Sequence, residues 1–344
     1  MTQPAASPSA SLKRRIALMF APLVAFNAGV WIWAFAVFGD HPALLGTCAL
    51  AYVLGLRHAV DPDHIAAIDN VTRKLMQEGR QPISVGLWFA IGHSALICIA
   101  VCAIAFTATS LSDERFEGWR EIGGVVSTIC SATFLFIIAA FNMMVLANVW
   151  SSYRALRRTG HYAEERIEEL LKNRGFLARF MQPCFALVSR GWHMFPLGFL
   201  FGLGFDTATE VSLFSIAATE SARGFSLASI MIFPLLFTAG MALIDTMDGV
   251  LMLGAYHWAY VKPRRKLIYN LVITTLSVVV ALCIGLLETL ALLGAKFDLT
   301  DGVWSAVAAL NAHYGDLGFV IIALFAMVWL GAWLAQRSKR VATP

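Results

Sequence analysis

Charged residues are scarce in this chain: 14% of its 344 residues are Asp, Glu, Lys or Arg, whereas 58% are hydrophobic. A soluble domain carries about 25% charged residues, so this composition excludes an ordinary soluble protein. The alternation of an outer-membrane barrel, in segments of about ten residues, is also missing. These absences leave a polytopic all-α membrane protein, in which each spanning helix needs roughly 20 mostly apolar residues.

Several chemical motifs are absent as well. The six cysteines form no Cys-x-x-Cys pair, so neither a disulfide framework nor a zinc knuckle is indicated. No Walker A sequence occurs, so ATP is not the direct energy source within this chain, and no ATPase subunit is evident in it. The net charge of +4 does not call for a nucleic-acid partner, because the basic residues follow the membrane pattern described next.

Eight charge-poor runs are long enough to cross a bilayer. Most of the 26 Lys and Arg residues fall on one side if both termini are cytoplasmic, as the positive-inside rule requires. The sequence therefore predicts eight transmembrane helices in a lipid bilayer, with both termini in the cytoplasm. The predicted spans are 16–38, 43–71, 83–108, 123–148, 193–217, 227–260, 268–294 and 318–335.

One long polar insertion divides these spans into four and four. Its stretch 162–180 has apolar and charged residues at helical spacing, which predicts an amphipathic helix on the cytoplasmic side. The expected organisation is a disordered cytoplasmic N-terminus (1–15), spans one to four (16–148), a cytoplasmic loop (149–191), spans five to eight (193–335) and a cytoplasmic tail (336–344).

Polar clusters interrupt four of the apolar spans, each near mid-bilayer at about 1.5 Å of rise per residue. Ionisable residues at that depth normally face the protein interior and mark an ion or substrate path. Acids three or four residues apart share a helix face and repel each other unless a cation or proton is present. These clusters therefore predict cation transport. In the structural alternative, the acids form hydrogen bonds to threonines across helices. The clusters contain Arg57, His58, Asp61, Asp63 and His64; His93; Asp206, Thr207, Thr209 and Glu210; and Asp245, Thr246 and Asp248.

The second span needs a break if it is to bind a metal. In a straight helix His58 and His64 lie about 9 Å apart along the axis, too far to share one ion at about 2 Å. Pro62 lacks the N–H that would bond to the His58 carbonyl, so a kink is expected here, as at the midplane sites of many transporters. The prediction is that His58, Asp63 and His64 converge, with Asp61 in support.

His93 is a further candidate ligand, because it lies at a similar depth in the third span. A lone histidine in a span also serves as a hydrogen-bonding group between helices, and that alternative stays open. Imidazole and carboxylate ligands together suit Ni, Co, Zn or Cu, and this chemistry does not choose among those ions.

With these residues in place, the chain resembles the nickel/cobalt transporter family, often called NiCoT permeases. The resemblance rests on Arg57-His58-Ala59-Val60-Asp61-Pro62-Asp63-His64, on Gly92-His93-Ser94, and on the segments 203–210 and 240–248. It implies uptake of Ni²⁺, Co²⁺ or both across a bacterial cytoplasmic membrane, with no prosthetic group and no enzymatic activity. It also implies that His58, Asp63 and His64 are central to recognition. The family more often has alanine at the position of Pro62.

Two rival functions are weighed against uptake. Efflux permeases for the same metals often carry a histidine-rich loop, whereas the loop 149–191 holds only His161, which favours uptake. A metal-dependent membrane enzyme is disfavoured, because a zinc protease would show His-Glu-x-x-His and none occurs.

Overall fold

The computed structural model describes residues 10–107, 114–159, 188–204, 207–260 and 263–341, and every regular element in these ranges is helical. The amphipathic helix predicted at 162–180 and the candidate residue Asp206 lie outside the described residues. The first elements are α1 (Ala10–Phe38), α2 (Pro42–His58), α3 (Pro62–Gln77), α4 (Val85–Thr107) and α5 (Glu114–Thr159). After these come η1 (Gly191–His193), α8 (Met194–Phe201), η2 (Gly202–Gly204), α9 (Ala208–Ala222), α10 (Leu227–Ile230), α11 (Ile232–Tyr260), α12 (Pro263–Lys296), α13 (Val303–Ala312) and α14 (Tyr314–Val341).

Five of these helices are long and apolar enough to cross a membrane, or seven if two bent pairs each count as one span. The bent pairs are α2 with α3, at 52°, and α13 with α14, at 75°. In the fifth predicted span, 193–217, α8 has 8 residues and α9 has 15, with the short η2 after α8. The described part of the chain therefore supports a multi-pass membrane protein with five to seven spans. The total of eight spans stays a prediction.

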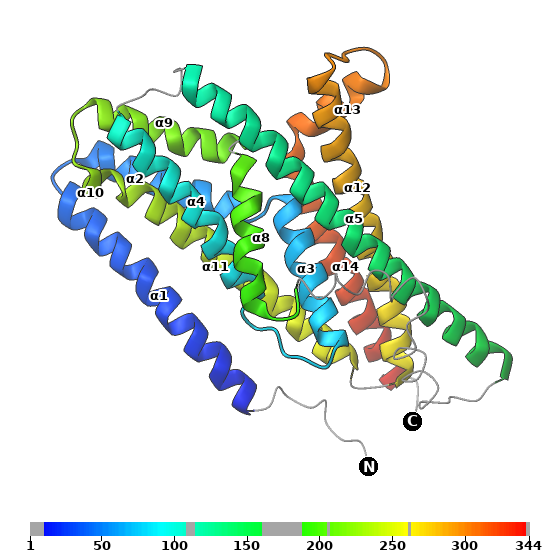
Figure 1. Cartoon of the computed structure of the whole chain (residues 1–344). Coiled ribbons are helices and arrows are strands. Elements are labelled where there is room, and N and C mark those ends of the chain that lie inside the picture. Colours follow the sequence, from blue (N-terminus) through cyan, green and yellow to red (C-terminus); the bar gives the residue numbers. More distant parts are fainter. Residues whose placement is uncertain (1–9, 108–113, 160–187, 205–206, 261–262, 342–344) are drawn as a thin grey trace.

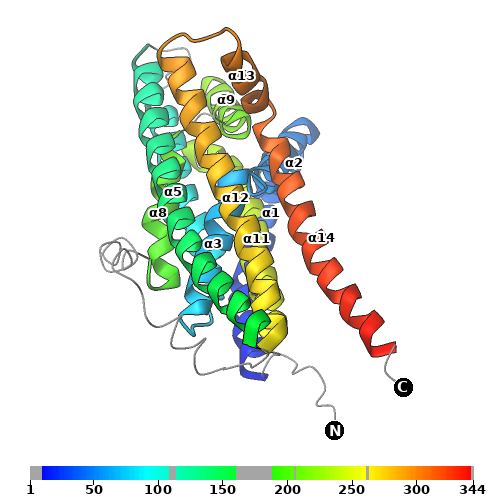
Figure 2. The ribbon, with the colours of Figure 1, turned by 90° about the vertical axis from the view of Figure 1, so that its right-hand side faces the viewer.

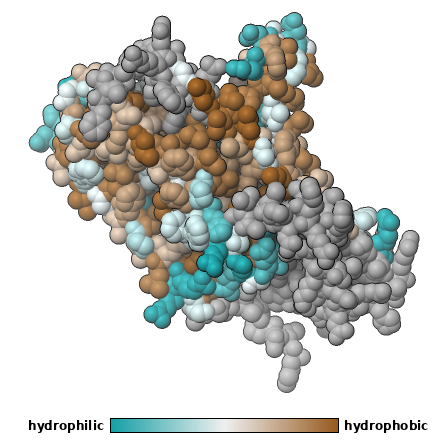
Figure 3. Space-filling view, in the orientation of Figure 1, coloured by the Kyte–Doolittle hydropathy of each residue, from teal (hydrophilic) through white to brown (hydrophobic). Residues whose placement is uncertain are grey.

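The helix α11 lies at the centre of the bundle, where it contacts α1, α2, α3 and α4 (Figure 1). On the other side of the molecule α5 and α12 run alongside each other, as Figure 2 shows. Hydrophobic residues cover much of the face in Figure 3, and hydrophilic residues gather toward its lower edge and at the tip near α13. Such an extensive apolar surface is unfavourable in water and suits a bilayer.

Glycine residues allow the helices around the site to approach closely. A Cβ atom at Gly92 of α4 would overlap the Phe195 carbonyl oxygen of α8, and one at Gly198 of α8 would overlap the Phe89 carbonyl oxygen of α4. Small residues at such crossings let backbones touch, which is how membrane helices gain packing energy. A side chain at either glycine would therefore force the α4 and α8 backbones apart.

Two basic residues lie deeper than the sequence indicates. Arg73 and Lys74 follow the second predicted span, 43–71, where exposure to water is expected, yet they are 0% and 2% exposed. They are buried because α3 continues to Gln77 and packs against α5 and α12. Arg73 donates from Nη2 to Asn70 Oδ1 at 2.8 Å, and Lys74 donates from Nζ to the Val188 carbonyl oxygen at 2.6 Å.

Candidate metal site

The break between α2 and α3 brings two histidines together. His58 is the last residue of α2, and His64 lies in the first turn of α3. Between them the Asp61 N–H donates to the His58 carbonyl oxygen at 2.9 Å, and Pro62 begins the new helix. The ring centroids of His58 and His64 lie 4.7 Å apart. The sequence therefore predicts the break at the place where the structure has it.

A third histidine comes from the neighbouring helix α4. The ring centroid of His93 lies 4.8 Å from that of His58 and 4.9 Å from that of His64. One nitrogen atom from each ring lies within 4.8 Å of the others, and all three side chains are buried. We call His58, His64 and His93 the histidine triangle.

Two nitrogens of the triangle and one carboxylate oxygen converge. His58 Nε2 and His93 Nε2 are 2.8 Å apart, and Glu210 Oε1 of α9 lies 3.0 Å from His93 Nε2 and 3.8 Å from His58 Nε2. Ligand atoms at about 2.1 Å around one ion lie about 3.0–3.4 Å from each other. The spacing of these three atoms is therefore close to that of neighbouring ligands in one coordination shell.

The second carboxylate contact orients His64. Both oxygens of Asp245 on α11 lie 3.4 Å from His64 Nδ1. The other nitrogen, Nε2, is buried and has no hydrogen-bond partner among the described residues. In metal sites a carboxylate beside one ring nitrogen fixes the tautomer and turns the other nitrogen toward the ion. The environment of His64 has this form.

His58 is oriented by groups from two elements. Its Nδ1 lies 2.8 Å from Asp61 Oδ2 and 3.1 Å from Thr209 Oγ1. At the start of α9, the Thr207 hydroxyl caps the helix by accepting from the Glu210 N–H at 3.4 Å, and it donates to Glu210 Oε2 at 2.9 Å. The first turn of α9 therefore positions both Thr209 and Glu210 beside the histidines.

Other predicted site residues lie outside the triangle. Asp63 Oδ1 accepts a hydrogen bond from the His64 N–H at 3.0 Å. Asp63 lies at the start of α3, where the helix dipole stabilises a negative charge. Thr246 and Asp248 lie on α11 beyond Asp245, and neither Thr246 Oγ1 nor Asp248 Oδ2 has a hydrogen-bond partner among the described residues. Arg57 contacts Asp61 rather than a histidine, with Nη1 and Oδ1 3.0 Å apart.

Comparison with known proteins places this geometry in a family. The family model described as "High-affinity nickel-transport protein" matches residues 44–335, which include every described candidate site residue. The chain belongs to the high-affinity nickel-transport protein family. The motif resemblance to nickel/cobalt permeases is therefore confirmed.

Individual members of this family cover nearly the whole chain. The "High-affinity nickel transport protein" of Cupriavidus necator is 55% identical over 95% of this chain and 93% of its own length. The "Hydrogenase nickel incorporation protein HupN" of Bradyrhizobium diazoefficiens is 51% identical over 91% of this chain and 82% of its own. The "Cobalt transport protein NhlF" of Rhodococcus rhodochrous is 37% identical, over 95% and 94% respectively. No solved structure matches this nickel-transport family member.

Sequence reasoning missed two aromatic residues that wall the triangle. The Phe89 ring meets His64 edge-on with centroids 4.7 Å apart, and the Phe237 ring lies 5.4 Å from that of His58. Phe89 is four residues before His93, so helical spacing alone puts the two on one face of α4. The signal for Phe89 was therefore present, whereas Phe237 comes from a distant part of the chain.

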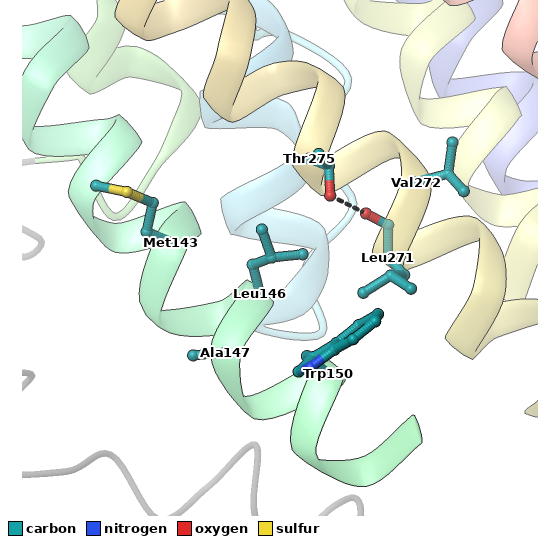
Figure 4. A pocket seen from close by; sticks show the side chains of 7 residues that line it. All are labelled: Met143, Leu146, Ala147, Trp150, Leu271, Val272 and Thr275. Atoms are coloured by element: carbon teal, nitrogen blue, oxygen red, sulfur yellow. Dashed lines mark hydrogen bonds between the residues drawn. The ribbon is translucent and has the colours of Figure 1, made fainter. Parts of the chain in front are cut away.

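The structure also has an open apolar pocket of about 640 Å³ between α5 and α12 (Figure 4). Its lining contains no titratable side chain, and its one hydroxyl, on Thr275, donates to the Leu271 carbonyl oxygen at 2.8 Å. The lining therefore offers no imidazole or carboxylate to a cation. The lining residues are Met143, Leu146, Ala147, Trp150, Leu271, Val272 and Thr275.

Proposed function

We propose that this protein takes up Ni²⁺, Co²⁺ or both across the cytoplasmic membrane of a bacterium, and that the ion binds in the histidine triangle. The observation that carries the proposal is the cluster of three buried imidazoles, in which His64 Nε2 has no hydrogen-bond partner among the described residues. A buried polar atom without a partner is costly, so a ligand is its natural complement. The relatives' names support nickel and cobalt as the substrate ions.

The donor set suits these ions. Three imidazoles with the Glu210 carboxylate form a nitrogen-rich set of intermediate softness, which fits Ni²⁺ and Co²⁺ better than Mg²⁺ or Ca²⁺. Asp61 would orient His58, and Asp245 would orient His64, each through the Nδ1 atom of the ring. We propose that Asp63 stabilises the start of α3 and adds negative charge near the site, and that it is not a direct ligand of the ion. Its carboxylate accepts a hydrogen bond from the His64 N–H.

The proposed exit route for the ion runs along acidic residues of α11. Asp245, Thr246 and Asp248 lie in order along α11, and we propose that they, with Asp206, neutralise the ion or exchange protons as it leaves toward the cytoplasm. Membrane potential contributes about 2.3 kcal/mol per charge per 100 mV, so a divalent ion is drawn inward without ATP. If a protonophore leaves uptake unchanged at constant potential, proton coupling is refuted.

The topology we propose has eight spans with both termini cytoplasmic, divided at the loop 149–191 as the sequence predicts. It counts α8 with α9 as one broken span, in the way that α2 and α3 form another. Broken helices that meet at a midplane site are common in secondary transporters.

The decisive experiment compares His64→Ala with wild type in two assays. Calorimetry on the purified protein measures Ni²⁺ binding, and cells expressing each form measure accumulation of radiolabelled Ni²⁺ in competition with Co²⁺, Zn²⁺, Cu²⁺ and Mn²⁺. We expect His64→Ala to lose both. His41→Ala removes an exposed histidine whose side chain makes no cap hydrogen bond, and it should behave as wild type.

Two outcomes would overturn this proposal in different ways. Unchanged Ni²⁺ binding by His64→Ala would refute the site. Lower accumulation in cells with the wild-type protein than in cells with an empty vector would refute uptake and indicate efflux.

A further inference from the structure

The second broken helix pair lies directly against the first. The start of α14 packs on the turn 59–61, and α14 continues alongside α3 (Figure 1). A Cβ atom at Gly318 would overlap the Val60 carbonyl oxygen, and one at Gly315 would overlap the Arg57 guanidinium. Val60 is buried in a cluster that includes Ile321 and Phe325 of α14. The helix α14 therefore covers the turn that carries the site.

A line of charged side chains runs from the histidine triangle to the surface through this contact. His58 Nδ1 lies 2.8 Å from Asp61 Oδ2, Asp61 Oδ1 lies 3.0 Å from Arg57 Nη1, and Arg57 Nη2 lies 3.7 Å from Asp316 Oδ1. The exposed fraction of the side chain rises along this line, from 2% and 7% for His58 and Asp61 to 31% for Arg57 and 71% for Asp316. The line therefore connects the buried site with the exterior.

The guanidinium of Arg57 stands between two carboxylates that would otherwise attract a cation. It repels a divalent ion that approaches from Asp316, and it neutralises Asp61, the acid next to His58. The Phe319 ring, whose centroid is 5.2 Å from Arg57 Cζ, holds the guanidinium in place from α14. A cation moving along this line can reach the triangle only after Arg57 has moved.

We propose that Arg57 and Asp316 close an entrance to the histidine triangle, and that the ion gains access when Arg57 releases Asp316 and the start of α14 moves off the turn 59–61. This proposal rests on the proposed transport function. An ion pair with exposed partners is weak and easily exchanged, which suits a contact that must open in every transport cycle. In the proposed topology the connection from α12 to α14 is outside the cell, so this entrance serves the incoming ion.

The test measures access to the turn with a cysteine at position 59. Ala59→Cys is introduced into a chain whose six native cysteines are replaced, and its reaction with a membrane-impermeant cationic thiol reagent is timed in intact cells. Loss of the exposed pair through Asp316→Asn should speed labelling roughly two- to fivefold. Arg57→Gln should speed it at least as much, and Asp316→Glu should restore the original rate. Saturating Ni²⁺ should slow labelling in the parent chain.

A matched control separates the contact from general surface charge. Asp301→Asn removes an exposed acid on the same connection without touching Arg57, and labelling should not change. Equal labelling rates in the parent, Asp316→Asn and Arg57→Gln chains would overturn the proposal, and so would an equal increase in Asp301→Asn. If Ala59→Cys does not fold, Val60→Cys serves as the reporter. Because His64→Ala tests nickel binding separately, failure of the entrance leaves the site proposal standing.

Discussion

Replacement of Asp245 by Asn tests whether the carboxylate beside His64 Nδ1 orients that ring for metal binding. Both Asp245 oxygens lie 3.4 Å from His64 Nδ1, beyond the usual hydrogen-bond range of about 2.7–3.2 Å, so the contact is a long one. Both side chains are 0% exposed, so water screens this interaction little. The amide keeps the volume of the carboxylate but cannot become negatively charged when a cation binds.

The expected size follows from groups that orient metal ligands. Their loss typically weakens metal affinity by about 10- to 100-fold. Because the contact is long, we expect the lower end, about tenfold, which corresponds to about 1.4 kcal/mol. Calorimetry with Ni²⁺ on the purified protein measures the affinity, and the midpoint of thermal unfolding without metal shows whether folding has changed.

Glu220→Gln is the matched control, because Glu220 is a buried acid of α9 that pairs with Arg223 at 2.8 Å and lies ten residues along that helix from Glu210. It should leave nickel affinity unchanged. Equal affinity in wild type and Asp245→Asn, with His64→Ala unable to bind, would show that His64 binds the ion without help from Asp245.

Four further substitutions test other residues of the site and of the helix packing around it. Asp61→Asn should weaken nickel binding by about tenfold, because Asp61 orients His58. Asp63→Asn should lower the free energy of unfolding by about 0.3–1 kcal/mol with little change in nickel affinity. If calorimetry shows a larger loss of nickel affinity in Asp63→Asn than in Asp61→Asn, Asp63 is the functional acid. Gly92→Ala should destabilise the fold by about 1–3 kcal/mol or more, measured as thermal unfolding, because α8 backbone fills the space. Its control Gly29→Ala, with nothing within 4 Å of the added Cβ, should be neutral or slightly stabilising. Pro62→Ala should retain nickel binding and transport, and loss of both would show that the proline is required for the break.

The sequence indicates which histidines could come together better than it indicates the residues that contact them. Polar residues in apolar spans are visible without a structure, and three of them, His58, His64 and His93, come together. The contacts that orient them cross between helices, as Asp245 does with His64 and Thr209 with His58. Such pairs depend on how each helix is rotated in the bundle, and that is set by packing rather than by spacing along the chain.

The fifth predicted span shows where hydropathy alone misleads. A hydropathy count treats 193–217 as continuous, yet α8 ends at Phe201 and passes into the 3-10 turn Gly202–Gly204. Glycine weakens a helix interior, and Thr207 then caps a new helix through the Glu210 N–H. The break puts Glu210 in the first turn of α9, beside His93, so the signals that interrupt the span are the ones that position the site.

The break at 59–61 does not depend on Pro62 in the way that the straight-helix argument suggests. That argument assigns the kink to the missing N–H of Pro62, but Pro62 is at the beginning of α3, where a helix leaves its first N–H groups without internal partners in any case. The His58 carbonyl oxygen already accepts from the Asp61 N–H, and Asp61 has the extended conformation of a residue that precedes a helix. Alanine at position 62 is compatible with the same two helices, because the first N–H groups of α3 need no partner within the helix. Proline thus favours a break that Asp61, the packing of α14 on Val60 and the histidine contacts also stabilise.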